Sequence, residues 1–237
     1  MRRMSASLPP VFMRITCGLV ATSALGCVHV GARSSAQTSF KIPHEPLKSL
    51  SVELVASVGE VEVKGGCEDL LEATISYPED DFPDVGLKVG GGHGDMRIRG
   101  SRSGDRQVGE WDLCLSDDLP TNLHVDVGAG ELDLDLRRVD VRSIQLAAGT
   151  GETDVVFGVP RTDVRVTIEG GVGEIDLRVP LGASVEIDAK VGIGERTFEG
   201  FTRHGEVWRS EAWSKDAPTL HVDLRVGTGE IDVRAYD

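Results

Sequence analysis

Apolar and polar residues alternate along most of this chain from Leu50 onward, which is the pattern of half-buried β-strands. The alternation changes phase wherever a Gly-x-Gly pair occurs. Around Glu131 the apolar positions are Leu123, Val125 and Val127 before it, then Leu132, Leu134 and Leu136 after it. In one unbroken strand this change would turn the second set toward solvent. The glycines are therefore predicted to form a structural corner that restores the inward direction.

The corner belongs to a repeat of seven related copies, Gly-x-Gly followed by an acidic residue and alternating apolar residues. In the five later copies the corner glycines are Gly128, Gly130, Gly149, Gly151, Gly171, Gly173, Gly192, Gly194, Gly227 and Gly229. Two earlier copies are Ser57–Val63 and Gly92–Ile98. The acidic residues stand at positions 60, 95, 131, 152, 174, 195 and 230, so the gaps are 35, 36, 21, 22, 21 and 35 residues. A unit of about 21 residues with three insertions indicates a repeat architecture that stacks its units.

The predicted fold class is all-β, with very little helix because no segment of the mature chain has a 3.6-residue apolar period. We expect a β-solenoid of about seven strand–GxG–strand repeats, with equivalent residues stacked about 4.8 Å apart. The alternative is an antiparallel hairpin meander or sandwich, in which each corner is a four-residue hairpin loop. The near-constant spacing and the similar corners favour the solenoid.

The N-terminus has the layout of a secretory signal, with a basic start, a short apolar run from Ile15 to Leu25 and small residues before Cys27. The small residues before this cysteine resemble the lipobox of bacterial lipoproteins, although Ala24 stands where leucine is preferred. The resemblance implies that Cys27 is the lipid-modified first residue of the mature protein. The predicted domains are a lipoprotein-type signal peptide at 1–26, a flexible tether at 27–47 and a β-repeat domain at 48–237. They imply a membrane-anchored protein of the bacterial cell envelope, facing the periplasm or the cell exterior.

The net charge bears on the possible partners, and the cysteines bear on a possible disulfide. The formal net charge of −14 becomes −17 once the three arginines of residues 1–26 are removed, so the domain should repel nucleic acid. Cys67 and Cys114 are the two cysteines outside the signal and the lipobox. They could form a disulfide in an exported protein, or remain two buried thiols.

No motif predicts catalysis, a bound metal or another cofactor. The six histidines have no metal-binding spacing, and there is no nucleophile elbow or phosphate loop. Stacked copies would align their acids in a ladder that could attract cations. However, Gly170–Ile175 places Ile175 where calcium-binding β-rolls carry their ligand aspartate. A solvated acidic face is the preferred interpretation.

The repeated Gly-x-Gly-Asp/Glu followed by alternating Val, Ile and Leu resembles the bacterial toast-rack family, the adhesin-like proteins of DUF4097 type. The resemblance covers about residues 48–237 and is most specific from Leu123 to Val233. It implies an all-β, envelope-associated protein without established catalytic residues. This chain departs from the family in having glutamate where aspartate is frequent, and Arg196 at an inward position of the sixth copy.

These observations predict a non-enzymatic lipoprotein of the cell envelope that serves adhesion, scaffolding or protein interaction. The expected partners are the membrane, through the lipid anchor, and an envelope protein or glycan. The alternative function is an envelope-stress sensor or regulatory binding module.

Overall fold

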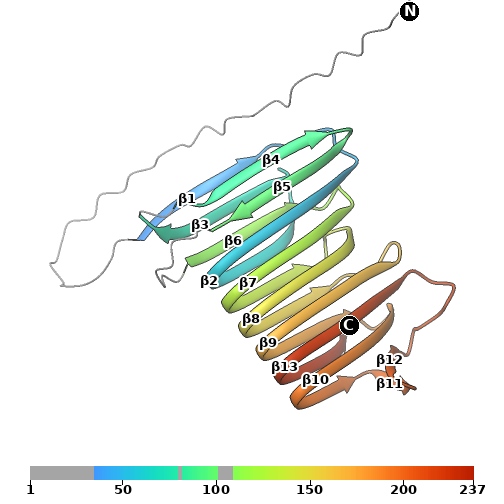
Figure 1. Ribbon diagram of the computed structural model, residues 1–237. Helices are drawn as coiled ribbons and strands as arrows, with labels where there is room; N and C mark the ends of the chain where they lie inside the picture. Colours follow the sequence, from blue (N-terminus) through green and yellow to red (C-terminus); the bar gives the residue numbers. More distant parts are fainter. Residues whose placement is uncertain (1–34, 80–81, 101–108) are drawn as a thin grey trace, which may run out of the picture.

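The computed structural model describes residues 35–79, 82–100 and 109–237, and every regular element in these ranges is a β-strand (Figure 1). The strands are β1 (Ser35–Ile42), β2 (Ser49–Cys67), β3 (Leu71–Pro78), β4 (Asp84–Gly90), β5 (His93–Arg99), β6 (Gly109–Ser116), β7 (Thr121–Leu136), β8 (Val141–Phe157), β9 (Val164–Pro180), β10 (Ser184–Glu199), β11 (Phe201–His204), β12 (Val207–Ser210) and β13 (Thr219–Tyr236). In the described ranges, no helix could serve as a membrane span. The predicted signal peptide at 1–26 and the predicted lipid-modified Cys27 lie outside these residues.

Six long strands, β2, β7, β8, β9, β10 and β13, each run through one glycine corner. The second glycine of each corner has a positive φ between 133° and 150°. In β7 the residues on the two sides of the corner, Val127 and Leu132, are both buried. The two halves of a strand thus form two layers with their apolar sides between them. The predicted change of phase at the corner is confirmed.

The corner strands stack in parallel and in register, with glycine on glycine. Gly130 pairs with Gly59 on one side and with Gly151 on the other, and Gly151 pairs with Gly173. The predicted β-solenoid is confirmed, and the alternative in which each corner is a hairpin loop is wrong. Figure 1 shows the bends along one edge of the stack, on its left, which we call the corner edge. The connecting turns lie along the opposite edge, the turn edge.

The corner glycines are required by close contact between neighbouring coils. A Cβ atom added to Gly151 would lie 1.7 Å from the carbonyl oxygen of Gly130. A Cβ added to Gly149 would lie 2.2 Å from the carbonyl oxygen of Gly128. Since a carbon and an oxygen atom that are not bonded to each other never approach so closely, only glycine fits at either position without pushing the coils apart.

The spatial order of the coils differs from their order in the chain. β9 and β10 do not pair with each other, because the last strand, β13, lies between them and pairs in parallel with both. The order along the stack is therefore β2, β7, β8, β9, β13, β10. The near-constant spacing of the repeat gave no indication that the last strand lies between β9 and β10.

The copy at Gly92–Ile98 is not a corner. Gly91 and Gly92 form the turn of the antiparallel β4–β5 hairpin, and Asp95 pairs with Ser51 in the first half of β2. The corner position of that coil is taken by Gly109 and Glu110, which pair with Gly59 and Glu60. The coil is divided between β5 and β6, so the Gly-x-Gly pattern selected the wrong glycines.

The tether predicted at 27–47 is wrong for residues 35–42, which form β1. This strand pairs antiparallel with β3 along its whole length. Phe40 and Ile42 are 6% and 4% exposed, so their side chains extend the core beneath the sheet. Two apolar residues at alternating positions were too short a signal to distinguish an edge strand from a linker.

Arg196 occupies its expected register position opposite Ile231, but at the end of the stack. The second half of β10 pairs only with β13 among the described strands, and Arg196 on its inward side is exposed. The Arg196 guanidinium donates to the carbonyl of Ala189. An inward charge on an edge strand discourages further strand pairing, which accounts for the departure from the repeat.

Candidate functional surface: two carboxylate ladders

In-register stacking aligns the acidic residue that follows each corner into a continuous row. This first row, in spatial order, consists of Glu110, Glu60, Glu131, Glu152, Glu174, Glu230 and Glu195. A second row, two residues further along each strand, consists of Asp112, Glu62, Asp133, Asp154, Asp176 and Asp232. We call these two rows the carboxylate ladders. Neighbouring strands are about 4.8 Å apart, so each carboxylate inside a row has a like charge on either side, and each end member has one on a single side.

Desolvation and repulsion within the ladders raise the pKa of four ladder members. The pKa of Glu131 is raised chiefly by the charge of Asp133. The pKa of Asp133 is raised chiefly by desolvation, and then by the charge of Asp154. Glu174 and Asp176 also have raised pKa values, with desolvation as the first cause and neighbouring ladder carboxylates as the next. All four shifts have the same sign because desolvation and the neighbouring acids both disfavour the charged form.

Arginines offset part of the second row from its turn-edge side. Arg178 donates to Asp154 at 2.6 Å, and Nε of Arg234 donates to Asp232 at 3.1 Å. The side chains of both aspartates are only 16% exposed. No ion pair to a corner glutamate occurs within the described ranges. The first row is therefore the uncompensated one.

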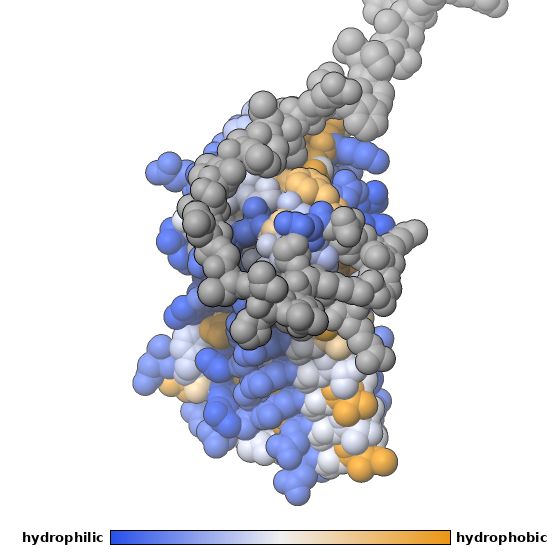
Figure 2. All heavy atoms as spheres, turned by 90° about the vertical axis from the view of Figure 1, so that its left-hand side faces the viewer, coloured by the Kyte–Doolittle hydropathy of each residue, from blue (hydrophilic) through white to orange (hydrophobic). Residues whose placement is uncertain are grey.

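The ladders lie beside the corner edge of the molecule. Figure 2 looks onto this edge, and its lower part, which grey atoms do not cover, is largely hydrophilic with a few hydrophobic spots. Two of the exposed apolar residues are Val172 and Ile193, at the middle positions of two glycine corners. The surface thus combines repeated carboxylates with a narrow, partly apolar ridge.

Three ladder members, Glu152, Asp154 and Asp176, bring one carboxylate oxygen each to within 4.8 Å of one another. Calcium takes six to eight oxygen ligands in proteins, and this group offers three side chains. Asp154 is also held by Arg178. The cluster by itself does not define a metal centre.

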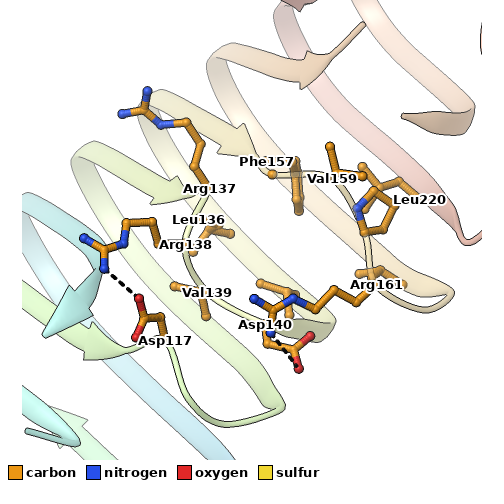
Figure 3. A pocket seen from close by; sticks show the side chains of 14 residues that line it. Asp117, Leu136, Arg137, Arg138, Val139, Asp140, Phe157, Val159, Arg161 and Leu220 are labelled. Carbon is orange, nitrogen blue, oxygen red and sulfur yellow. Dashed lines mark hydrogen bonds and ion pairs between the residues drawn. The ribbon is translucent and has the colours of Figure 1, made fainter. Parts of the chain in front are cut away.

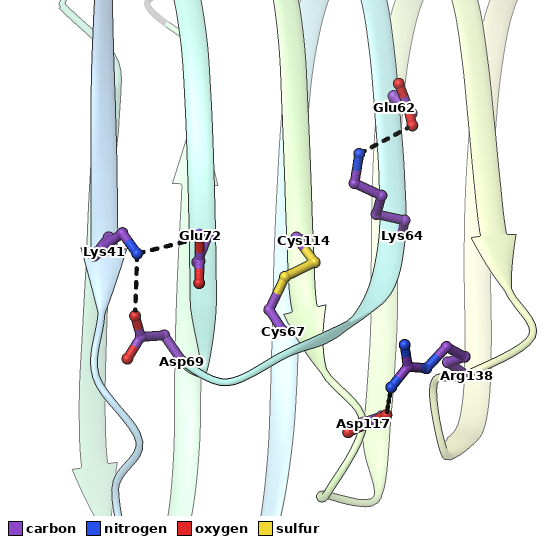
Figure 4. Close-up of a disulfide and its surroundings, with 9 residues drawn as sticks. All are labelled: Lys41, Glu62, Lys64, Cys67, Asp69, Glu72, Cys114, Asp117 and Arg138. Carbon is purple, nitrogen blue, oxygen red and sulfur yellow. Dashed lines mark hydrogen bonds and ion pairs between the residues drawn. A yellow bond between two sulfur atoms is a disulfide. The ribbon is translucent and has the colours of Figure 1, made fainter.

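The two remaining cysteines are joined in the structure. A disulfide connects Cys67 at the end of β2 with Cys114 in β6, with Cα atoms 5.9 Å apart (Figure 4). Ion pairs surround it: Lys41 bridges Asp69 and Glu72, and Arg138 pairs with Asp117 at 2.8 Å. The disulfide thus connects two neighbouring coils near the β1 end of the stack.

Sequence reasoning missed two ladder members, Glu110 and Asp112. Their coil lacks the first corner glycine, but Gly109-Glu110-Trp111-Asp112-Leu113 retains the acidic and apolar alternation of the other copies. Trp111 is 6% exposed and occupies the inward position that Val61 takes in β2 and Leu132 takes in β7. A search for the alternation, without the first glycine, would have found the coil.

The comparisons with known proteins agree with this architecture. The family model for the N-terminal domain of toast_rack (DUF2154) matches residues 31–178. No curated protein matches the chain significantly. A crystal structure of a candidate cell adhesion protein from Clostridium sporogenes superposes with a TM-score of 0.79 at 23% identity, covering 86% of this chain and 100% of the other. A candidate adhesin from Bacteroides fragilis covers 85% of this chain and 98% of its own at 12% identity, with a TM-score of only 0.25.

The family match spans more than half of the chain, and the parallel stack of glycine corners is the fold expected from the resemblance. The chain belongs to the toast-rack family.

Proposed function

We propose that this protein is a non-enzymatic lipoprotein of the bacterial cell envelope whose toast-rack domain serves adhesion, scaffolding or protein interaction. The observation that carries the proposal is the pair of carboxylate ladders. They repeat one chemical group at a fixed spacing, which suits multivalent contact with a partner that repeats its own cationic or hydrogen-bonding groups.

The electrostatics favour binding over catalysis. Carboxylate pairs that catalyse reactions have pKa values pushed apart, so that one group is an acid while the other is a base. In the ladders Glu131, Asp133, Glu174 and Asp176 are all shifted upward. None of these four carboxylates has a lowered pKa, so together they do not form the acid and base pair of such a mechanism.

The likeness to the candidate cell adhesion protein from Clostridium sporogenes supports an adhesive role by analogy of fold. The basic start, the apolar run and Cys27 support export and lipid anchoring. The mature mass of the protein and its membrane fractionation test the anchor. We expect Cys27→Ser to abolish the lipid mass increment and release the protein from membranes; an unchanged mature mass would refute lipidation.

Photo-crosslinking on whole cells tests the contact surface. A photoreactive amino acid replaces Glu152 in the first ladder row or, as a control, Gln145 on the exposed side of the first half of the same strand. We expect a discrete crosslinked partner from position 152 only. The Gln variants of Glu131 and Glu174 should weaken that crosslink. Equal crosslinking from both positions would contradict a role for the ladders, and a regulatory protein as the partner would favour the sensor alternative.

A further inference from the structure

A hollow at the turn edge, opposite the carboxylate ladders, has a different chemistry from the rest of this acidic molecule. Its volume is about 370 Å³, and the turns after β7 and β8 form most of its wall (Figure 3). Binding sites for small molecules have volumes from about 300 Å³ upward. We call it the turn-edge hollow.

Three arginines line the turn-edge hollow, Arg137, Arg138 and Arg161. Their side chains are 57%, 65% and 68% exposed, so they are accessible to a ligand. Three carboxylates pair with these arginines, Asp135, Asp117 and Asp140, and Arg142 also pairs with Asp140, so four guanidinium groups share three carboxylates. The hollow is thus locally cationic on a chain with a formal net charge of −14.

The arginines differ in how firmly neighbouring acids hold them. Arg138 donates to Asp117 at 2.8 Å, and Arg137 is paired with Asp135. Asp140 is already engaged by Arg142 at 2.8 Å, whereas Arg161 reaches the same carboxylate only at 3.9 Å. Of the three arginines, Arg161 therefore has the weakest ion pair with a neighbouring acid. Its side chain can turn toward the hollow.

The hollow also has an apolar side. Phe157, Leu136 and Leu220 lie in its wall and belong to the core. Val159 at its rim is 66% exposed, one of the few large apolar side chains of the described residues left in solvent. This exposed side chain is available for contact with an apolar part of a ligand.

We propose that the turn-edge hollow binds a small amphipathic oxyanion, a carboxylate or phosphate joined to a compact apolar group. Arg161, with Arg138, holds the oxyanion through charge-assisted hydrogen bonds. Val159 at the rim covers the apolar group. Repulsion from the distant carboxylate ladders is screened over about 8 Å at physiological ionic strength, so the nearby arginines determine the local attraction.

Calorimetric titration of the folded protein with phenyl phosphate, phenol and inorganic phosphate tests the proposal. We expect phenyl phosphate to bind and both of its halves to bind at least about tenfold more weakly, since each lacks one of the two contacts. Equal affinity for inorganic phosphate would indicate a simple anion site and overturn the proposal. The absence of phenyl phosphate binding at millimolar concentration would also overturn it.

Two variants locate the site. Arg161→Ala should weaken phenyl phosphate binding about tenfold, and Val159→Ser should weaken phenyl phosphate but not inorganic phosphate. Arg203→Ala, on the exposed β11 strand, is the matched control and should leave binding unchanged. Melting curves establish that each variant is folded. Binding that survives Arg161→Ala, or that falls equally with Arg203→Ala, would place the ligand elsewhere.

Discussion

At the scale of the residue, glycine determines whether two coils can touch. At each corner a carbonyl oxygen of one coil occupies the space where the next coil's side chain would begin. The conformational and the steric requirements coincide at the second glycine, which also has a positive φ. This double requirement explains why the corner is the most regular part of the repeat.

Replacing Gly151 with alanine should destabilise the protein by about 3 kcal/mol, because the new Cβ meets a backbone oxygen and the φ of 138° is strained for alanine. Chemical denaturation measures the loss. Gly182→Ala is the control, since no neighbouring atom lies within 4 Å of its added Cβ. Similar losses for the two variants would show that the contact between coils does not determine the effect.

The ladder residues make stability depend on pH. Glu131, Asp133, Glu174 and Asp176 have raised pKa values when folded, so they bind protons more tightly in the folded state. Their contribution is most favourable below the ordinary carboxyl values of 3.8 and 4.5, and it is lost as pH rises through the raised values. We therefore expect the melting temperature to rise as the pH falls from neutral toward 5.

Glu53 and Asp135 oppose this trend at lower pH. Arginines lower their pKa, so the stability they contribute disappears as pH falls through those lowered values. The melting temperature should thus pass through a maximum at mildly acidic pH, as recorded by calorimetry. The double variant Glu131→Gln, Glu174→Gln should flatten the rise between pH 7 and 5. An unaltered slope in this variant would show that the ladder carboxylates do not cause it.

At the scale of the element, the two ends of the stack are covered in different ways. Antiparallel strands β1, β3 and β4 cover one end. At the other end the β11–β12 hairpin pairs with the first half of β10, and Phe198 stacks on Trp208 with ring centroids 4.3 Å apart. The second half of β10 relies on the charge of Arg196 instead of a covering strand.

The Cys67–Cys114 disulfide should stabilise the β2–β6 pairing. In the chain-entropy model, closing a loop with a sequence separation of 47 residues adds about 4 kcal/mol to the free energy of unfolding. We expect reducing agent to lower the melting temperature of the wild type and to leave the Cys67→Ser, Cys114→Ser double variant unchanged. A double variant as stable as the oxidised wild type would show that the pairing needs no covalent link.

At the scale of the whole molecule, the C-terminal strand is an internal part of the stack. β13 pairs with β9 and β10 along nearly its full length, and it carries the buried Leu224, Ile231 and Val233. Coil β10 therefore reaches its final neighbours only once β13 has taken its place. Folding of this end depends on contacts between distant parts of the chain.

A chain that ends at residue 218 should lose cooperative unfolding at its C-terminal end, because β9 and β10 would each expose an apolar edge. Circular dichroism melting and limited proteolysis measure this, and a chain ending at Tyr236 is the control. Gly173 of β9 and Gly194 of β10 both pair with Gly229 of β13, so β9 and β10 would be in register with each other if β13 were absent. A truncated protein that melts as sharply as the wild type would mean that β10 pairs directly with β9.

The sequence was sufficient to predict the class of fold, because the two-residue period and the phase change at the glycines are local properties. It also determined that the acids of most copies lie on one side, since stacked copies in register must align them. It misplaced the coil around Asp95, where the corner is interrupted and the motif recurs by coincidence in a hairpin turn. Similarly, two buried residues of β1 were too few for a periodic signal.

The order of the coils and the composition of the turn-edge hollow follow from long-range packing and could not be predicted from the sequence. Identical corners can pair in any order, so local pattern gives no preference for β13 between β9 and β10. Arg138 and Arg161 come from the turns of successive coils, and their relation to Val159 depends on how those turns pack. A repeat specifies what each coil is, whereas long-range packing decides which coils are neighbours and what surface their turns create.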